Sequence, residues 1–433
     1  MGLPIASLMH GARPKGTFMR ICLRFLYGLG VIILLFWSTS AAAEEGCTAA
    51  SAQDILDCAR RLHPDVMVSR SEALRDEKLT DIAKQRPNPA FDTRLLAGET
   101  ADDTVFNTED TLLFNVELGG KRRARIDQAK AESNRSQIGI RKNMEIVTLE
   151  TVRALYRLRQ ITSELARVNE TVSAYDKIIR NFRLRPKLTP EQEASRTTFE
   201  LAKQDFQLKK ISLVQEQANL SRLLELATEL PNETIRRYLP KSKQKWPKLE
   251  PNASPESLDN AAIAEARSEQ SVAETKLKVA QSKAWPDLFV GPTFDTETSS
   301  NDTRLTGGLG VAIALPVLNR NQGEKSFATA DRIRAETQMR STVRKIWTER
   351  AIQVRRYEAA LQALRSQSPG NLNVQHENVE AFYERGLLPS TLVIEAHSQW
   401  YDVVRARHDQ ELTAVDAFWR VQIIDGKMEE TQL

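Results

Sequence analysis

Residues 161–182 read ITSELARVNETVSAYDKIIRNF, and their apolar side chains recur at alternating spacings of four and three. This is heptad spacing, which is typical of helices that pack as coiled coils. Because no proline lies between Lys121 and Phe182, the pattern predicts one helix of about 60 residues and roughly 90 Å. The seam comprises Ile140, Met144, Val147, Thr151, Ala154, Leu158, Ile161, Leu165, Val168, Val172, Tyr175, Ile179 and Phe182.

The helix is predicted to turn back on itself. Pro186 and Pro190 interrupt it, and apolar residues then recur every seven positions on the returning segment: Phe199, Phe206, Leu213 and Leu220. A second helix with an apolar stripe is predicted to be interrupted at Pro369-Gly370, to resume, and to end in a turn at residues 386–390. It contains Val343, Trp347, Val354, Tyr357, Leu361 and Leu364. Two antiparallel helical hairpins are therefore expected.

Four segments alternate between apolar and polar residues: Phe91–Ala97, Thr111–Leu118, Leu288–Phe294 and Leu305–Leu315. Period-two alternation with an apolar face is typical of membrane barrel strands, although a half-buried strand of a soluble sheet gives the same pattern. The polar residues 98–103 and 295–302 are expected to form the hairpin tips. Four strands cannot close a barrel, so a membrane-spanning subunit must oligomerise.

The two halves of the chain are arranged alike. Pro87 and Pro286 are 199 residues apart, and so are Pro190 and Pro389. This constant offset predicts an internal duplication in which residues about 52–228 and 258–425 superpose. The expected layout is a first repeat over 44–228, a linker or equatorial connection over 229–257, a second repeat over 258–426 and a tail over 427–433. The linker is expected to have little regular structure.

The N-terminus has the pattern of a secretory signal peptide over residues 1–43. Arg20 and Arg24 precede an apolar run, and Ala41-Ala42-Ala43 supplies a cleavage site. A membrane anchor is the rival interpretation. Met19 is an alternative start. In the mature chain, Cys47 and Cys58 are predicted to form a disulfide, with two free thiols as the alternative.

Composition excludes several functions. The net charge of +4 is small and the charges are interleaved, so no nucleic-acid partner is expected. No catalytic constellation, phosphate-binding loop or metal-ligand spacing is present, so the chain is predicted to be no enzyme and to carry no cofactor or metal. His376, His397 and His408 are interpreted as ordinary helix residues.

Taken together, the plan resembles the TolC family of outer-membrane efflux proteins. The motifs Glu117-Leu118-Gly119-Gly120-Lys121-Arg122 and Leu315-Pro316-Val317-Leu318-Asn319-Arg320-Asn321-Gln322-Gly323 are similar to those of its cobalt–zinc–cadmium branch. The resemblance implies a mainly α fold with a small membrane β part, in a trimer with a 12-strand barrel and an α-helical tunnel. It further implies an exit duct for heavy-metal cations in the cell outer membrane. Its partners would be a periplasmic adaptor (membrane fusion) protein, an inner-membrane resistance-nodulation-division type pump and outer-membrane lipid.

The resemblance also suggests functional positions. Tyr383-x-x-Gly386 is similar to the periplasmic tip, which places Glu395 and Leu392 at the pore constriction. Tip and adaptor contacts are expected from Tyr383, Gly386, Leu387, Leu388, Pro389 and Ser390, and from Pro186, Lys187, Leu188 and Thr189. The first turn departs from the family because it lacks glycine. The strand-to-helix turns are assigned to Gly119, Gly120, Lys121, Arg122, Asn319, Arg320, Asn321 and Gly323.

Two alternatives stay open on the sequence alone. The basic cluster Lys121, Arg122, Arg123 and Arg125 either meets anionic head groups at the membrane edge or is a solvated helix face. The chain as a whole could instead be a periplasmic coiled-coil adaptor or structural protein without its own barrel. Such an adaptor would need neither the paired strands nor the duplication.

Overall fold

The predicted seams form long helical hairpins in the computed structural model, which describes residues 46–99, 104–242, 245–251, 253–299, 302–366 and 369–433. The first hairpin consists of α5 (Lys121–Arg183) and α6 (Pro190–Thr228). The second consists of α9 (Gln322–Ser366) and α10 (Pro369–Glu384) running out, and α11 (Ser390–Ile424) returning. The predicted helix of about 60 residues is confirmed, because α5 has 63.

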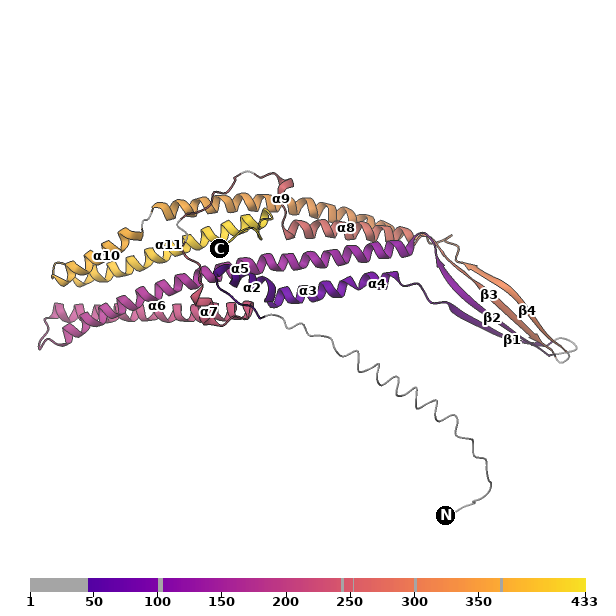
Figure 1. Cartoon of the computed structure of the whole chain (residues 1–433), viewed down its shortest axis with the longest axis horizontal. Helices are drawn as coiled ribbons and strands as arrows, with labels where there is room; N and C mark the ends of the chain where they lie inside the picture. The colour runs from indigo at the N-terminus through magenta and orange to yellow at the C-terminus, as the bar shows by residue number, and fades with distance from the viewer. Residues whose placement is uncertain (1–45, 100–103, 243–244, 252, 300–301, 367–368) are drawn as a thin grey trace, which may run out of the picture. The chain divides into compact units, whose positions relative to one another are not determined.

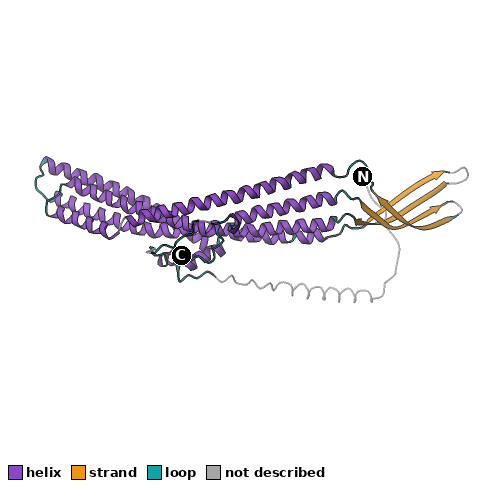
Figure 2. Cartoon of the chain, turned by 90° about the horizontal axis from the view of Figure 1, so that it is seen from above, coloured by secondary structure: helices purple, strands orange, loops and turns teal. Residues whose placement is uncertain are grey.

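Shorter helices extend each hairpin toward the sheet. In the first half, α2 (Ala52–Leu62), α3 (Pro64–Glu77) and α4 (Leu79–Lys84) pack along α5. In the second half, α8 (Ala261–Ser282) packs against both α9 and α5. The four strands then extend from the ends of these helices (Figures 1 and 2). Among the described residues, none of the helices combines the length and the apolar character that crossing a bilayer requires.

A single antiparallel sheet has the order β1-β2-β3-β4. Its strands are β1 (Ala90–Glu99), β2 (Thr104–Glu117), β3 (Asp287–Thr298) and β4 (Thr303–Ile313). All four predicted strands are therefore present, and the pairing of β2 with β3 joins the two halves of the chain. Both predicted tips were too long. Residues 98–99 are paired with β2, and residues 295–298 have partners on both neighbouring strands.

The register separates the side chains into two faces. One face carries most of the large apolar side chains, namely Phe91, Leu95, Phe106, Leu112, Phe114, Val116, Leu288, Val290, Phe294, Leu305, Leu309, Val311 and Ile313, with Thr93, Thr108 and Asp110 as polar exceptions in its middle. The opposite face is mainly polar or small, with apolar exceptions, and includes Asp92, Arg94, Asn107, Glu109, Asn115, Thr293, Asp295, Gly308, Gly310 and Ala312. The sheet is thus amphipathic, as period-two alternation predicts. Its apolar face becomes polar at the hairpin tips, where Glu99, Thr104, Thr298 and Thr303 lie.

The sheet curves toward its polar face. Thr111 on β2 and Gly310 on β4 are separated by β3, so a flat sheet would hold them about 10 Å apart. A Cβ atom built on Gly310 would nevertheless lie 3.3 Å from the methyl group of Thr111 and 2.8 Å from Oγ1 of Thr293. Glycine is therefore favoured at position 310, and more strongly at 291, where a Cβ atom would lie 1.7 Å from the carbonyl oxygen of Leu112. The apolar face is convex.

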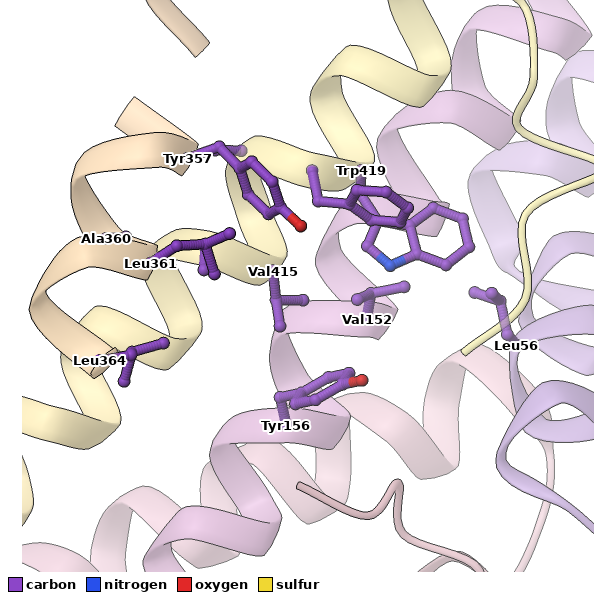
Figure 3. Close-up of a cluster of buried hydrophobic side chains, with 12 residues drawn as sticks. Leu56, Val152, Tyr156, Tyr357, Ala360, Leu361, Leu364, Val415 and Trp419 are labelled. Carbon is purple, nitrogen blue, oxygen red and sulfur yellow. The ribbon is translucent and has the colours of Figure 1, made fainter. Parts of the chain in front are cut away.

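The largest apolar core lies where the two hairpins meet the linker (Figure 3). Trp419 of α11 and Tyr156 of α5 are fully buried there, together with Leu56 of α2. Tyr357 of α9 packs against Phe418 and donates a hydrogen bond of 2.7 Å to the carbonyl oxygen of Pro247. Since Pro247 belongs to the linker, this contact fixes the connection between the repeats across the core.

The linker has more regular structure than predicted. It contains the helix α7 (Asn232–Arg237) and the short 3₁₀ turn η1 (Pro255–Ser257). Ile235 of α7 is fully buried against the side of the first hairpin, which explains why this segment folds despite its flanking prolines. The signal peptide over 1–43 lies outside the described residues, and the superposition of the two repeats stays a prediction.

A buried ionic cluster ties α11 to α5 and α6. Glu164 of α5 is fully buried and accepts hydrogen bonds from Arg157 at 2.8 Å and from Nδ1 of His408 at 2.7 Å. Arg157 also donates to Glu216 of α6. Burial raises the pKa of Glu164, but the hydrogen bonds from His408 and Arg157 outweigh it, so the net pKa lies below its usual value. His408 is therefore no ordinary helix residue, because its ring forms a hydrogen bond with a buried carboxylate.

Glu145 of α5 makes the stability of the bundle depend on pH. Its carboxylate accepts a 2.8 Å hydrogen bond from the backbone of Ala261 at the start of α8 and lies 3.4 Å from Nε of Arg141. Burial raises the pKa of Glu145 to about 7, although both contacts act to lower it. A raised pKa means that the folded state keeps a proton that the unfolded state releases. Stability is therefore lost as pH rises from about 4.5 to about 7.

We expect Glu145→Gln to remove this loss, which is on the order of 3 kcal/mol, because the amide oxygen can still accept from Ala261. This loss of stability is measured by thermal melting at pH 5 and pH 8, with the helical circular dichroism signal as the readout. The wild-type melting temperature should fall relative to the variant as pH rises. Glu358→Gln, at an exposed position of α9, is the control and should follow the wild type. Parallel profiles for wild type and Glu145→Gln would contradict the assignment.

Candidate functional site: the helical tip

The first turn of the tip is closed by a capping box. Oγ1 of Thr189 accepts a hydrogen bond from the backbone of Gln192 at 3.3 Å, and the side chain of Gln192 accepts one from the backbone of Thr189 at 3.2 Å. Pro190 then occupies the first helical position, where no backbone donor is needed. The reciprocal bonds fix the start of α6. The turn therefore needs no glycine, which accounts for its departure from the family pattern.

The second turn is closed by a glycine. Gly386 has φ +72, a conformation that residues with a Cβ rarely adopt. Its backbone donates to the carbonyl of Tyr383 at 2.8 Å, and Leu387 donates to the carbonyl of Phe382 at 3.0 Å. This is the Schellman pattern that ends a helix. Pro389 then precedes α11, which begins at Ser390.

An aromatic cluster holds the two turns together. Tyr175 of α5 packs against Phe199 and Phe206 of α6, with ring centroids 5.5 and 5.8 Å apart. Phe199 meets Tyr383 of α10 at 6.0 Å, and Phe206 meets Tyr401 of α11 at 5.9 Å. These five residues, called the tip aromatic cluster below, come from α5, α6, α10 and α11. Burial raises the pKa of Tyr175 and of Tyr383.

His397 of α11 lies beside the tip aromatic cluster and is 1% exposed. Its ring packs edge-on against Tyr175 at 5.3 Å, its Nδ1 atom is 3.3 Å from Oγ1 of Thr171, and its Nε2 atom is 3.7 Å from Glu380. The interpretation of His397 as an ordinary helix residue is thus corrected: it is a buried polar residue that links α11 to α5. The described residues contain no group of three or more possible metal ligands.

A groove of about 550 Å³ separates α5 from the second turn. Lys177 and Arg185 line it on the first hairpin, and Tyr383 and Leu388 line it on the second. Three of the predicted tip residues, Tyr383, Gly386 and Leu388, therefore line one groove. Pro186 and Lys187 are exposed beyond the first turn, whereas Leu188 is partly buried against the core of the hairpins.

Glu395 and Leu392 lie on the free face of α11. Val393, His397 and Tyr401 of the same helix are buried against the first hairpin. At 100° per residue, Glu395 points about opposite to that buried face. Its carboxylate is exposed and accepts a 2.6 Å hydrogen bond from Gln399, while Leu392 is 51% exposed. Both side chains are solvent-exposed among the residues that the structure describes, so they can face a lumen or a neighbouring copy.

The strand-to-helix turns are fixed at the other end of α5. Gly119 and Gly120 both have positive φ, and Trp285 packs so closely on Gly119 that a Cβ atom there would lie 2.5 Å from its ring. Lys121 pairs with Asp287 at 2.6 Å, which ties the start of α5 to β3. Sequence reasoning named the glycines and Lys121 but missed Trp285 and Asp287. The sequence did contain a signal for these two residues, because both lie in the short segment directly before the third predicted strand.

The second such turn is held by a side chain in an unusual backbone conformation. Asn321 has φ +57, which asparagine tolerates better than most residues, and its amide donates to the carbonyl of Ala280 at 2.9 Å and to Glu324 at 2.8 Å. Asn319 accepts from the backbone of Asn321 at 2.8 Å. Arg320 and Gly323 are exposed in the same turn. The predicted motif is therefore a structural connection between β4 and α9.

Solved outer-membrane channels have the same fold. The CusC channel has a TM-score of 0.67 at 12% identity, covering 89% of this chain and 95% of that chain. The CmeC outer membrane channel of Campylobacter jejuni has a TM-score of 0.63 at 14% identity, covering 87% and 86%. The open-state MtrE outer membrane channel of Neisseria gonorrhoeae has a TM-score of 0.63 at 13% identity, covering 87% and 89%.

No family model matches the sequence, and no curated protein matches it either. At 12–14% identity the likeness to the solved structures establishes the fold. The chain is mainly helical, with two long helical hairpins and four antiparallel strands, and this is the fold of those outer-membrane channels. The fold that the TolC resemblance implied for a single chain is thereby confirmed.

The tip aromatic cluster is expected to stabilise the junction of the hairpins. Phe199→Ala should cost about 3–5 kcal/mol because Phe199 is fully buried between Tyr175 and Tyr383. Leu184→Ala is the control, since Leu184 lies in the neighbouring turn and is 82% exposed. Thermal melting and proteolysis at the tip compare the two. Equal melting temperatures would show that Phe199 does not hold the tip.

Proposed function

We propose that this chain is the outer-membrane exit duct of a tripartite efflux system. The observation that carries the proposal is the amphipathic sheet, whose apolar face is convex and whose two edge strands, β1 and β4, pair on one side only among the described residues. Unpaired backbone groups are too costly in lipid for an open sheet to be stable there. A sheet of this kind becomes stable in a bilayer when the edge strands of neighbouring copies pair with each other.

Strand direction favours closure between copies. The four strands alternate in direction, so β4 of one copy runs antiparallel to β1 of the next. Adding copies side by side therefore continues the same antiparallel pairing. Three copies supply twelve strands, within the range of 8 to 26 that bacterial barrels use. The apolar convex face then meets lipid, and the polar concave face with its glycines lines the lumen.

The helices supply the periplasmic part of the duct. At 1.5 Å per residue, the 63 residues of α5 span about 90 Å between the sheet and the tip. In a trimer, the four hairpin helices of each copy make a twelve-helix tunnel. The duct is passive: it catalyses no reaction, holds no cofactor, and conducts substrate that an inner-membrane pump of the resistance-nodulation-division type delivers.

A periplasmic adaptor is proposed to engage the tip. The groove lined by Lys177, Arg185, Tyr383 and Leu388 and the exposed turn residues Pro186, Lys187 and Leu387 offer a mixed polar and apolar surface for it. The cargo is proposed to be heavy-metal cations. Support comes from the two strand-to-helix motifs and from the free face of α11, where three symmetry-related Glu395 carboxylates would favour cations.

The trimer is tested by extraction and mass. The protein should resist carbonate extraction, require detergent, and give three copies per particle in native mass spectrometry, because only a closed barrel satisfies its edge strands in lipid. Release by carbonate alone, or a stable monomer cross-linked in membranes, would favour the soluble coiled-coil adaptor.

The pore residue is tested by conductance in planar bilayers. Glu395→Ala should reduce cation preference and weaken block by divalent ions, because it removes the carboxylates proposed to face the lumen. Stability should change little, since Glu395 is exposed in the single chain. Glu191→Ala, an exposed acid in the first turn of α6, is the matched control. Unchanged selectivity and block for Glu395→Ala would place this residue outside the lumen.

A further inference from the structure

Arginines without acidic partners gather where the sheet meets the helices. Arg86 precedes β1, Arg122 and Arg123 begin α5, and Arg320 precedes α9. All four are exposed, and none has a carboxylate partner among the described residues. Two of them are anchored, since Arg122 donates to the carbonyl of Lys84 at 2.9 Å and Arg320 to that of Pro316 at 3.3 Å. We call these four residues the junction arginines.

Three other cations at this level are paired with carboxylates. Lys121 is paired with Asp287, Arg125 with Glu117, and Lys283 with Glu324. The basic cluster that the sequence shows after β2 therefore divides into two kinds of residue. Lys121 and Arg125 hold the strand-to-helix turn, whereas Arg122 and Arg123 remain available for an anion outside the chain.

Apolar side chains lie beside the junction arginines. Val317 and Leu318, in the turn between β4 and α9, are 75% and 93% exposed. Trp285, in the turn before β3, is 61% exposed although its ring packs on Gly119. All these turns lie at one end of the sheet, because alternate strands begin and end there. Large exposed apolar residues thus lie next to four arginines that have no carboxylate partner in the described part of the chain. This combination is typical of a membrane–water interface, where aromatic and basic side chains flank an apolar band.

From this arrangement we propose that the junction binds anionic phospholipid of the periplasmic leaflet. The junction arginines contact the phosphate groups, and Val317 and Leu318 enter the boundary between head groups and acyl chains. The surface is continuous with the apolar convex face of the sheet, which ends at Ile313 only a few residues earlier. The inference rests on the proposed function, since it needs the sheet to lie in a membrane.

A second copy of the chain fits this surface less well. In the proposed trimer a neighbouring copy already places its own junction arginines at the same level, so a contact between copies adds positive charge and does not neutralise these residues. A free inorganic anion would satisfy the arginines but would leave Leu318 in water. A phospholipid meets both requirements at once, because its phosphate and its acyl chains are joined at the spacing of a membrane interface.

The test uses the full mature protein in neutral detergent, with lipid binding followed by native mass spectrometry. Phosphatidylglycerol should bind at least tenfold more tightly than phosphatidylcholine. The triple variant Arg122→Gln/Arg123→Gln/Arg320→Gln should lose this preference, since each basic residue near an anionic surface contributes about a fivefold gain in affinity. The control Arg344→Gln/Arg355→Gln/Arg356→Gln removes the same charge from exposed positions of α9, about 30 Å or more from the junction, and should keep it.

Three results would overturn the proposal: no preference in the wild type, a preference kept by the junction variant, or displacement of phosphatidylglycerol by inorganic phosphate. Particle mass and bilayer conductance, measured on the same variants, report the proposed function separately. A trimeric, conducting protein without lipid preference would leave the duct intact and refute the lipid site. A monomeric, non-conducting wild type would refute the duct itself.

The apolar contact is tested in proteoliposomes. A fluorophore attached through Leu318→Cys should be quenched by lipids brominated near the head of the acyl chain. One attached through Leu184→Cys, at the far end of α5, should not be quenched. Efficient cross-linking of Leu318→Cys between copies, without quenching, would instead assign this surface to the contact between subunits.

Discussion

Heptad packing along α5 is the interaction on which the other elements depend. Its seam pairs with α6 over most of that helix, and α2, α3, α4, α8 and α11 also pack along it. A coiled coil keeps its register only while each side chain inserts between residues of its partner, so a slip at one level would displace every level. One continuous helix therefore sets the distance between the sheet and the tip. Once the sheet end of α5 is placed, the position of its tip end is fixed as well.

Buried charges add specificity to this apolar packing. Arg157, Glu164 and His408 meet in the interior at one level of α5, where only the correct axial position of α11 brings His408 to Glu164. A shift of one turn would leave the carboxylate buried without a partner, which is strongly destabilising. The apolar seam alone tolerates such a shift better, because leucine, valine and alanine can exchange places. The ionic cluster thus restricts α11 to one register.

Much of the fold could be predicted from the sequence because its signals are periodic. A seam from Ile140 to Phe182 indicates helix at every turn, and the alternation from Leu305 to Ile313 indicates a strand with one apolar face. The contacts that decide the site are not periodic. Trp285 on Gly119, His408 on Glu164 and His397 against Tyr175 join residues far apart in the chain, and nothing local indicates the partner. Strand ends were also missed, since polar residues 295–298 resemble a loop until their partners are known.

The difference between periodic packing within a hairpin and isolated contacts between hairpins determines how the tip of the proposed duct can move. Within the first hairpin, apolar side chains of α5 and α6 pack together over much of the length of α6, which couples the movement of the two helices. Between the hairpins, the tip aromatic cluster makes edge-on contacts such as Phe199 with Tyr383 and Phe206 with Tyr401. Ring contacts of this kind depend weakly on exact position and survive small sliding. The groove of about 550 Å³ beside Tyr383 means that packing between the hairpins is incomplete there. Because α11 is anchored to the first hairpin through Val393, His397 and Tyr401, displacement of α10 beside the groove is less costly than displacement of α11, and a partner that engages the second turn acts where the resistance is smallest.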